Sequence, residues 1–283
     1  MRRLKSFDKN ANVLYMVAVP IGNLKEMTPR ALEILKESDY IFCEDTRNTA
    51  SLLNKFDLRK ELISLREHNE SSVSNKVIDL LKDGKKISYV SDAGYPGISD
   101  PGKILVKKVR ESGFAVSTIS GSNALLNALV SSSLDATHFY FHGFLSSIDK
   151  KAKEELETLK NKNETIIFYE APHRIERTTH LLYEVMGDRK ATIARELTKL
   201  NEEYIEGSLS ELVTLDFSTL IGEMVIVLEG NNKEESVDDN SILSRADDLL
   251  KRNISLKDVS DIISFELKVG KNYVYNLLLN NKK

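Results

Sequence analysis

The stretch that decides the fold is Val90–Gly102, which reads V-S-D-A-G-Y-P-G-I-S-D-P-G. The apolar run Lys86–Val90 predicts a strand before it, and the pattern of Lys103–Val109 predicts a helix after it. Glycine permits positive φ and proline restricts its own φ and its neighbour, so this loop is expected to hold one shape. A rigid loop at the carboxyl end of a strand is a typical ligand site in open α/β sheets. The alternative is a surface turn in which Asp100 caps the helix and Pro101 is its first residue.

Strand-like and helical segments alternate through the first half of the chain. The strand-like runs cover residues 13–19, 39–44, 62–65, 86–90 and 115–119. This alternation predicts βαβ units, a mainly parallel sheet and an α/β fold class. Because parallel strands end at one edge of a sheet, the turns 20–24, 91–102 and 120–124 are expected to converge there.

The second half of the chain has more hairpin character. Strands are predicted at 137–144, 165–169, 191–194 and 222–229. We therefore expect an N-terminal α/β domain over residues 1–134 and a second α/β domain over 135–230. The polar and acidic stretch 231–240 predicts a linker, and three helical patterns after it predict a helix-turn-helix-like extension within 231–283. This extension either binds a partner or caps the second domain.

The composition excludes several classes of protein. The chain has 283 residues, a formal net charge of −3, one cysteine and five scattered histidines. These counts predict neither a disulfide framework nor a metal site. The apolar runs are too short to span a membrane, and residues 1–12 lack the apolar core of a signal peptide, so a cytoplasmic protein without a membrane partner is expected. A nucleic-acid site would have to be a local basic patch.

Eight short motifs occur in order along the chain. They are V-P-I-G-N-L (19–24), E-D-T-R (44–47), H-N-E (68–70), S-D-A-G-Y-P-G-I-S-D-P-G (91–102), G-F-L (143–145), F-Y-E-A-P-H-R (168–174), A-R-E-L-T-K (194–199) and G-E-M-V (222–225). Together they resemble the bacterial 16S ribosomal RNA (cytidine-2′-O)-methyltransferases, which belong to the tetrapyrrole methylase superfamily and use S-adenosylmethionine. The resemblance runs from about residue 13 to residue 230.

This resemblance implies two α/β domains with the methyl donor in the cleft between them, and a homodimer. It implies the small ribosomal subunit and its 16S ribosomal RNA as partner, with the methyl group going to the ribose 2′-hydroxyl of cytidine 1402 in the decoding centre. The donor pocket carries over to Pro20, Ile21, Gly22, Asp92, Ala93, Gly94, Asn123, Ala124, Tyr169, Glu170, Ala194, Met224 and Val225.

The chain departs from the family pattern at a few positions. Val19 stands where the family usually has threonine, and Ser146 replaces the proline after G-F-L. Ser120 and Ser122 replace both prolines of P-G-P at the third turn, which is expected to soften that turn.

A ribose 2′-hydroxyl is a poor nucleophile at neutral pH, so a group that handles its proton is expected. The polar candidates are Asp45, Arg47, His68, Asn69 and Glu70, and the sequence does not assign the base among them. Arg47 has the alternative of pairing with Asp45 or Glu44 as scaffold, and a lone histidine is more often structural. No lysine stands where a phosphate-binding loop needs one, and the aspartates beside the glycines suit a cationic or hydroxyl-bearing ligand better than a polyanion.

RNA must also be held by its phosphates. Basic candidates lie near the motifs and in the terminal extension: Lys150, Lys151, Arg174, Arg195, Lys199, Lys268 and Lys271. The alternative is that they are solvated surface charges. Phe144 and Tyr169 are candidates for stacking on a base, or they belong to the core. Two other functions remain open: methylation of a small tetrapyrrole, and a donor- or RNA-binding protein without activity.

Overall fold

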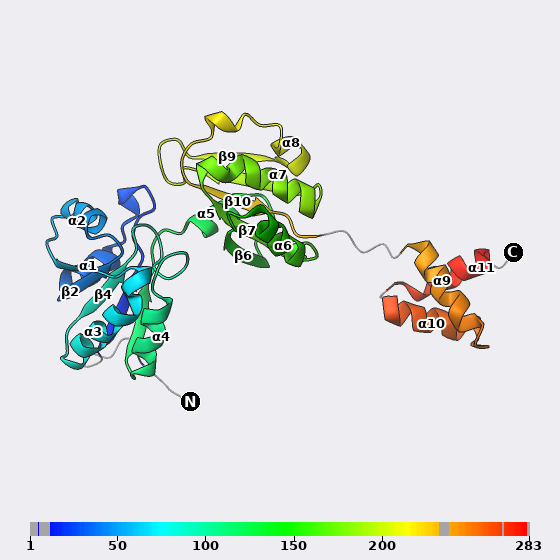
Figure 1. Cartoon of the computed structure of the whole chain (residues 1–283), viewed down its shortest axis with the longest axis horizontal. Helices are drawn as coiled ribbons and strands as arrows, with labels where there is room; N and C mark the ends of the chain where they lie inside the picture. The colour runs from blue at the N-terminus through cyan, green and yellow to red at the C-terminus, as the bar shows by residue number, and fades with distance from the viewer. Residues whose placement is uncertain (1–4, 6–11, 232–237, 268, 282–283) are drawn as a thin grey trace. The chain divides into compact units, whose positions relative to one another are not determined.

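The computed structural model describes residues 5, 12–231, 238–267 and 269–281. The chain divides between residues 231 and 232 into two compact units, which are described separately (Figure 1).

The first sheet of the larger unit is entirely parallel. Its strands are β1 (Val13–Val17), β2 (Tyr40–Cys43), β3 (Glu61–Ser64), β4 (Ile87–Val90) and β5 (Ala115–Ile119), in the order β3-β2-β4-β1-β5. In register, Tyr15 of β1 lies opposite Ser88 of β4, the central strand, and opposite Ser117 of β5. The predicted α/β class with a mainly parallel first sheet is therefore confirmed.

Helices cover both faces of this sheet. They are α1 (Pro29–Glu37), α2 (Thr46–Asn54), α3 (Glu70–Lys82) and α4 (Lys103–Glu111), with short 3₁₀ turns η1 (Leu24–Glu26) and η2 (Glu67–Asn69). One apolar cluster joins α3 and α4 to the sheet, and a second cluster joins α1 and α2 to its other face. The start of α1 follows the sequence signal, since Thr28 accepts a hydrogen bond from the Ala31 N–H and Pro29 is the first helical residue.

The second sheet is mainly antiparallel. Its strands are β6 (Phe139–Phe144), β7 (Thr165–Glu170), β8 (Lys190–Arg195), β9 (Glu203–Ser208) and β10 (Met224–Leu228), in the order β6-β7-β10-β8-β9. Only β6 and β7 run parallel. The edge strand β9 is absent from the sequence expectations because its only large apolar residues are Tyr204 and Ile205, and neither is fully buried.

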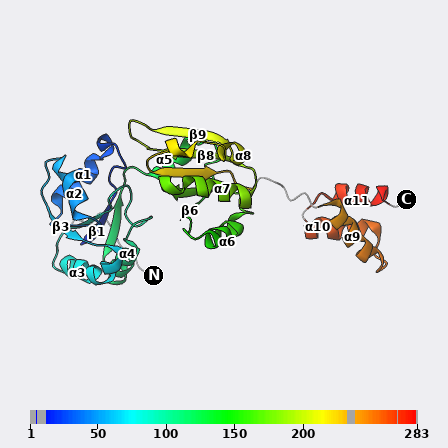
Figure 2. The same cartoon turned by 45° about the horizontal axis from the view of Figure 1, so that its top comes forward.

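Helices also lie on both faces of the second sheet (Figure 2). The helices α6 (Asp149–Leu159), α7 (Ile175–Met186) and α8 (Leu209–Leu212) pack on one face, with the 3₁₀ turns η3 (Pro172–Arg174) and η4 (Phe217–Thr219) in the connections. The other face receives α5 (Ala124–Val130), which follows the last strand of the first sheet but packs against β7 and β10. We therefore call residues 12–123 the first lobe and residues 124–231 the second lobe, whereas the predicted first domain ends eleven residues later, at residue 134.

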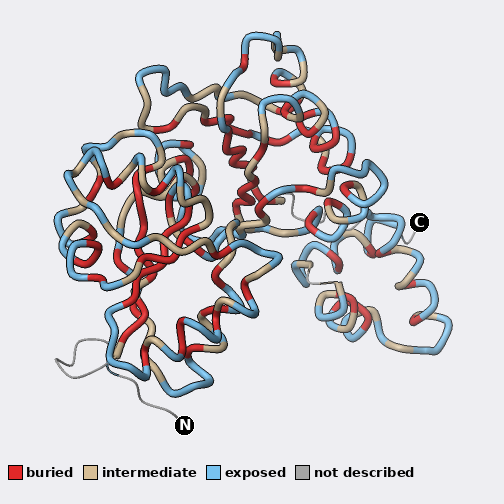
Figure 3. Tube along the Cα trace, turned by 60° about the vertical axis from the view of Figure 1, so that its left-hand side comes forward, coloured by how far each residue is buried: buried red, intermediate tan, exposed pale blue. Residues whose placement is uncertain are grey.

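The smaller unit is a three-helix cluster with its own core. Its helices are α9 (Asp239–Leu250), α10 (Leu256–Leu267) and α11 (Lys271–Asn280). Buried aliphatic residues from all three helices meet in one cluster, and Arg245 of α9 forms a two-pronged ion pair with Glu266 of α10. Most of the predicted linker, residues 232–237, lies outside the described residues, and α9 already begins at Asp239. In Figure 3 the buried segments are concentrated in the strands and on the inward helix faces.

Candidate functional site

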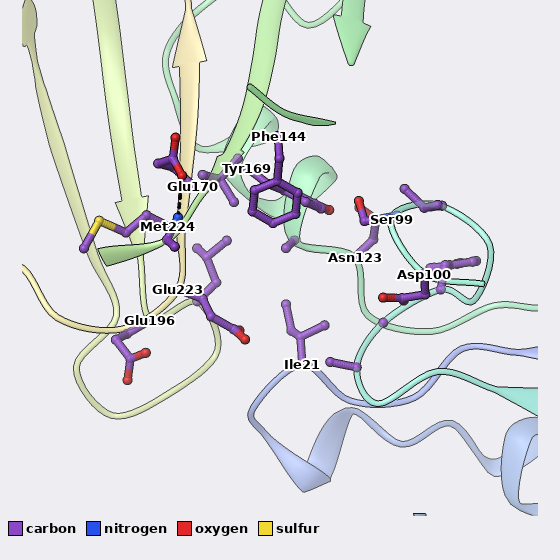
Figure 4. A pocket seen from close by; sticks show the side chains of 18 of the residues that line it. Ile21, Ser99, Asp100, Asn123, Phe144, Tyr169, Glu170, Glu196, Glu223 and Met224 are labelled. Atoms are coloured by element: carbon purple, nitrogen blue, oxygen red, sulfur yellow. Dashed lines mark hydrogen bonds between the residues drawn. The ribbon is translucent and has the colours of Figure 1, made fainter. Parts of the chain in front are cut away.

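A cleft of about 350 Å³ lies between the two lobes, at the carboxyl edge of the first sheet (Figure 4). Its lining comes from the motifs that the sequence singles out. The lining residues are Ile21, Ala93, Gly94, Tyr95, Ile98, Ser99, Asp100, Asn123, Ala124, Phe144, Tyr169, Glu170, Ala171, Pro172, Glu196, Leu197, Lys199, Glu223, Met224 and Val225.

The first wall of the cleft is a loop held by main-chain hydrogen bonds. Val19 and Gly94 exchange N–H···O bonds of 2.9 and 3.0 Å, and the Gly121 N–H donates to the Tyr95 hydroxyl at 3.2 Å. The three turns predicted to converge are therefore bonded to one another. Gly94 has φ +67°, and a Cβ there would lie 3.3 Å from the Ile21 Cγ2 atom, so both conformation and space favour glycine.

The third turn keeps its shape without the family's prolines. The Ser122 hydroxyl donates to the Glu26 carboxylate at 2.5 Å, and the Thr28 hydroxyl donates to the Ser120 carbonyl at 3.3 Å. These hydrogen bonds restrain the turn in place of the missing prolines. They therefore offset the expected softening.

Glu70 holds the far end of the first wall. Its side chain is buried, and its Oε1 atom accepts the N–H groups of Gly102 and Leu105, each at 2.9 Å. These are N–H groups at the start of α4, which begins at Lys103 and whose N-cap, Gly102, has no capping side chain. The interpretation of Asp100 as cap and Pro101 as first helical residue is therefore wrong, because a carboxylate from α3 already occupies the capping position.

Two acidic side chains point into the cleft from opposite walls. Figure 4 shows Asp100 entering from the first lobe and Glu223 from the second. Burial raises the pKa of the Asp100 carboxyl, a hydrogen bond from Ser91 partly opposes that rise, and the negative charges of Asp92 and Glu223 add to it. This part of the cleft therefore has a negative potential that favours a cation.

The second wall presents side chains held by packing. The Glu170 side chain is fully buried and accepts hydrogen bonds from the Thr178 hydroxyl (2.5 Å) and the Ala171 N–H (2.8 Å), and it pairs with Arg174 at 3.2 Å. Beside it the Tyr169 ring meets Phe141 and Phe144 edge to face, with ring centroids 4.9 and 5.7 Å apart. Burial raises the pKa of Tyr169 to about 12, so its hydroxyl stays protonated at physiological pH.

A loop of the second lobe lies across the first turn. The Thr198 hydroxyl accepts the Asn23 N–H at 3.1 Å, and a Cβ at Gly22 would come within 2.6 Å of the Lys199 Cγ atom. Glu196 and Thr198 adopt positive φ values of 50° and 67°, which non-glycine residues rarely do. This contact joins the two lobes next to Ile21 and Lys199, which line the cleft.

Most residues that the family resemblance carries over to the donor pocket line this cleft. They are Ile21, Ala93, Gly94, Asn123, Ala124, Tyr169, Glu170, Met224 and Val225. Four do not: Pro20 is buried, Gly22 is an exposed residue beside the Lys199 side chain, Ala194 is in the core, and Asp92 turns outward to accept hydrogen bonds from the Asp45 N–H and Asn48.

The proposed proton-handling residues lie outside the cleft lining. Asp45 caps α2 and accepts two side-chain hydrogen bonds from Arg47, at 2.6 and 3.1 Å, which hold the pKa of its carboxyl well below the usual range. The Asn69 side chain accepts a hydrogen bond from the Arg66 N–H, and the His68 side chain is exposed on η2. With Glu70 capping α4, none of these residues is placed like a general base in the cleft.

The predicted RNA-binding residues fall into three groups. Arg174 donates to the Leu145 carbonyl and pairs with Glu170, Arg195 pairs with Glu203, and Lys199 pairs with Glu196. Lys150 and Lys151 are exposed in the first turn of α6. In the smaller unit Lys271 pairs with Asp261, and Lys268 lies outside the described residues.

Sequence reasoning did not assign several lining residues to the pocket. These are Tyr95, Ile98, Ser99, Asp100, Ala171, Pro172, Glu196, Leu197 and Glu223. All of them lie inside the motifs quoted above. The motifs therefore indicated these segments of the pocket, although the individual residues were not selected from them. Among the described residues, no cluster of three metal-ligating side chains is found and no helix is long and apolar enough to cross a membrane.

Comparisons with known proteins agree with this architecture. The profile of the family described as Tetrapyrrole (Corrin/Porphyrin) Methylases matches residues 13–213. Two solved structures share the fold: uroporphyrin-III-C-methyltransferase from Thermus thermophilus (TM-score 0.55, 15% identity, covering 77% of this chain and 94% of that one) and the methyltransferase CobJ (TM-score 0.57, 16% identity, with the same coverage).

Relatives with a higher sequence identity have a different name from these two tetrapyrrole enzymes. "Ribosomal RNA small subunit methyltransferase I" of Bacillus subtilis is 45% identical over 238 residues, which is 83% of this chain and 82% of the relative. The protein of that name from Synechocystis is 38% identical over 271 residues, 94% of this chain and 97% of the relative. On both grounds, the family profile and these relatives, the chain belongs to the tetrapyrrole methylase family of methyltransferases.

Proposed function

We propose that this protein transfers a methyl group from S-adenosylmethionine to the ribose 2′-hydroxyl of cytidine 1402 in 16S ribosomal RNA. The observation that carries the proposal is the cleft between the lobes, which is lined by the motif residues and is acidic at its centre. The names of the curated relatives support ribosomal RNA as the substrate. The solved tetrapyrrole enzymes support the fold alone, so a tetrapyrrole substrate is not proposed.

The residues of the cleft fit a sulfonium donor. Asp100 and Glu223 offer negative charge to a cation, and within the described cleft lining they have no basic ion-pair partner. Phe144 and Tyr169 offer aromatic faces suited to an adenine ring. Main-chain groups of Ala93 and Gly94 approach the cleft without a bulky side chain. When bound, the donor supplies an already activated methyl group.

The chain's own part in the reaction is alignment and proton handling. Rigid walls that hold two reactants in line can supply about 7–11 kcal/mol of the barrier. The hydroxyl proton needs an acceptor whose pKa lies nearer to neutral than that of an ordinary carboxyl. We propose Asp100 for this role, because burial raises its pKa and its side chain points into the cleft.

The experiment uses small ribosomal subunits from a strain that lacks this methylation. Calorimetric titration with S-adenosylmethionine should show one donor site per chain. Incubation of the subunits with protein and methyl-labelled donor should place label on a cytidine ribose, mapped by nuclease digestion and mass spectrometry. Label on a base, or none on the subunits, would contradict the proposal.

We further propose that the protein is a cytoplasmic homodimer and that its smaller unit contributes to RNA binding. Light scattering should give twice the chain mass at micromolar concentration. Removing residues 232–283 leaves the larger unit with all the strands of the structure described here. The truncated protein should bind the donor as before but show a higher KM for subunits, whereas an unchanged KM would favour a purely structural role.

A further inference from the structure

The chemistry of the proposed substrate requires a cationic group beside the cleft. In RNA the 3′-phosphate is attached through O3′ to C3′, and C3′ is the ring neighbour of C2′, which carries the 2′-hydroxyl. A phosphate must therefore lie beside the reacting oxygen. The centre of the cleft is acidic because of Asp100 and Glu223, and a phosphodiester would be repelled there. The phosphate therefore needs a positive group at the rim.

Two arginines at the carboxyl edge of the first sheet share one carboxylate. Arg47 donates from Nε and Nη2 to both oxygens of Asp45, at 3.1 and 2.6 Å, and Arg66 donates from Nη2 to Asp45 at 3.3 Å. Arg66 also donates from Nε to the Glu44 carbonyl at 3.1 Å. Asp45 therefore holds two guanidinium groups in a fixed place, and we call Arg47 and Arg66 the arginine pair.

The arginine pair is exposed to solvent, and some of its N–H groups are available to bind a ligand. The Arg47 side chain is 85% exposed and that of Arg66 is 48% exposed. Within the part of the chain that the structure describes, neither Nη1 atom has a hydrogen-bond partner. The Asp45 side chain is 14% exposed and already caps α2, and exposed guanidinium groups add little further stability by pairing with it, so a structural role explains Asp45 better than it explains the two arginines. A guanidinium already oriented by a carboxylate loses less entropy when it binds a phosphate.

The pair is joined to the cleft by one hydrogen-bonded step. The Asp45 N–H donates to Asp92 Oδ1 at 3.3 Å, Asn48 donates to Asp92 Oδ2 at 2.7 Å, and the next residue, Ala93, lines the cleft. Besides Asp45, two more carboxylates lie close enough to act on the pair electrostatically, Asp92 beside Arg47 and Glu44 beside Arg66. By contrast, Arg174 and Arg195 are less exposed and already bonded within the second lobe.

We propose that Arg47 and Arg66 form a phosphodiester-binding site for the RNA strand that enters the cleft. The inference rests on the proposed function and deepens it by assigning a contact to the substrate backbone. It also gives the E-D-T-R motif a role other than proton transfer: Asp45 orients the guanidinium groups, and Arg47 binds the phosphate together with Arg66, which lies outside the motif.

The test measures methylation of unmodified small subunits at several salt concentrations, with Arg47→Ala, Arg66→Ala and Arg47→Lys. Each alanine variant should raise the KM for subunits by about tenfold and make the slope of log(kcat/KM) against log[salt] less steep by about 0.7–0.9, the value for one lost phosphate contact. Arg47→Lys keeps the charge but loses the two-pronged bond, so its salt slope should stay unchanged while its KM rises by a smaller factor.

Arg30→Ala is the matched control. Arg30 is an exposed arginine of the same lobe, paired with Glu33 at 2.8 Å on α1. Its removal should leave KM and salt slope unchanged. Donor affinity, measured by calorimetry, should be unchanged in all four variants, and thermal unfolding should show that each is folded.

The outcomes separate the two proposals. Wild-type protein that binds the donor but does not label subunits overturns the proposed function. Wild-type protein that labels them, with Arg47→Ala and Arg66→Ala variants that keep KM and salt slope, overturns the phosphate site alone. A fall in kcat without a change in salt slope also overturns it, because that result would place Arg47 in the chemical step.

Discussion

The two walls of the cleft are built on different principles. The first lobe presents a loop whose shape depends on backbone bonds between turns and on Glu70, a cap from another helix. The second lobe presents side chains from β7 and β10, and these are held by the buried Glu170 network and by aromatic packing. The first wall is fixed by hydrogen bonds to its main chain, and the second wall is fixed by packing and ion pairing among side chains.

This difference predicts how each wall fails. A substitution in the second wall leaves buried charge or a cavity, so it should act on stability first. A substitution in the first wall shifts a loop whose backbone faces the ligand, so donor affinity should fall together with a smaller loss of stability. Urea unfolding followed by fluorescence and calorimetric donor titration measure the two effects separately.

The largest effect is expected for Glu170→Ala in the second wall. The substitution leaves the partly buried Arg174 guanidinium without its ion-pair partner, and the Thr178 hydroxyl and Ala171 N–H lose their acceptor. Breaking a buried pair in this way costs about 3–5 kcal/mol in the free energy of unfolding. Glu184→Ala removes an exposed ion pair to Lys153 in the same lobe and should cost less than about 1 kcal/mol. Equal losses in the two variants would contradict the buried-network interpretation.

A smaller loss of stability is expected for Glu70→Ala in the first wall. Two N–H groups at the start of α4 lose their acceptor, which costs about 2–3 kcal/mol. Glu70→Gln keeps an acceptor oxygen and should preserve most of the stability. Since the loop ends at this cap, hydrogen exchange in residues 91–102 should accelerate in the alanine variant, and donor affinity should fall about tenfold, or about 1.4 kcal/mol. Unchanged exchange there would show that Glu70 does not hold the loop.

The matched pair Gly94→Ala and Gly84→Ala separates strain from function. Both glycines have positive φ, +67° and +74°, and a Cβ at Gly84 would meet nothing within 4 Å. Each alanine should therefore cost about 1–2 kcal/mol for the left-handed conformation. Only Gly94→Ala should weaken donor binding, because its Cβ enters the region of Ile21 beside the cleft. Equal donor affinities in the two variants would contradict the assignment of Gly94 to the wall.

The fold could be predicted from local patterns to a large extent. Alternating strands and helices give the parallel sheet, and Thr28 with Pro29 gives the start of α1. The cap of α4 could not be predicted in this way, because Asp100 is the local candidate while the actual acceptor, Glu70, lies more than thirty residues earlier. Likewise, nothing near 124–130 in the sequence indicates that α5 packs on the other sheet.

The candidate site shows the same division. Motif matching finds the turns that line the cleft, yet it gives no reason to separate Asp92, which turns outward, from Asp100, which points inward. The E-D-T-R and H-N-E segments read as proton-handling groups because their residue types suit that chemistry. Asp45 instead caps α2 and pairs with Arg47 two residues away, and Glu70 caps α4 more than thirty residues later in the chain. The first contact is local, whereas the second depends on a neighbour that is distant in sequence.

The smallest effect on stability, and one of opposite sign, is expected for Asp100→Asn. Because burial raises the pKa of this carboxyl in the folded protein above its unfolded value, folding is favoured when the group is protonated and becomes less favourable as pH rises through the folded pKa. Asparagine avoids this penalty, so the variant should be more stable at neutral pH by less than about 1 kcal/mol, since solvent screens a partly exposed carboxylate. The gain should shrink as pH falls toward 4.

Donor affinity of the Asp100→Asn variant should nevertheless drop, and methyl transfer should drop further, because the cleft loses both a negative charge and its proposed proton acceptor. A variant that gains stability and keeps full activity would show that Asp100 serves neither role, and Glu223→Gln would then be the variant to compare.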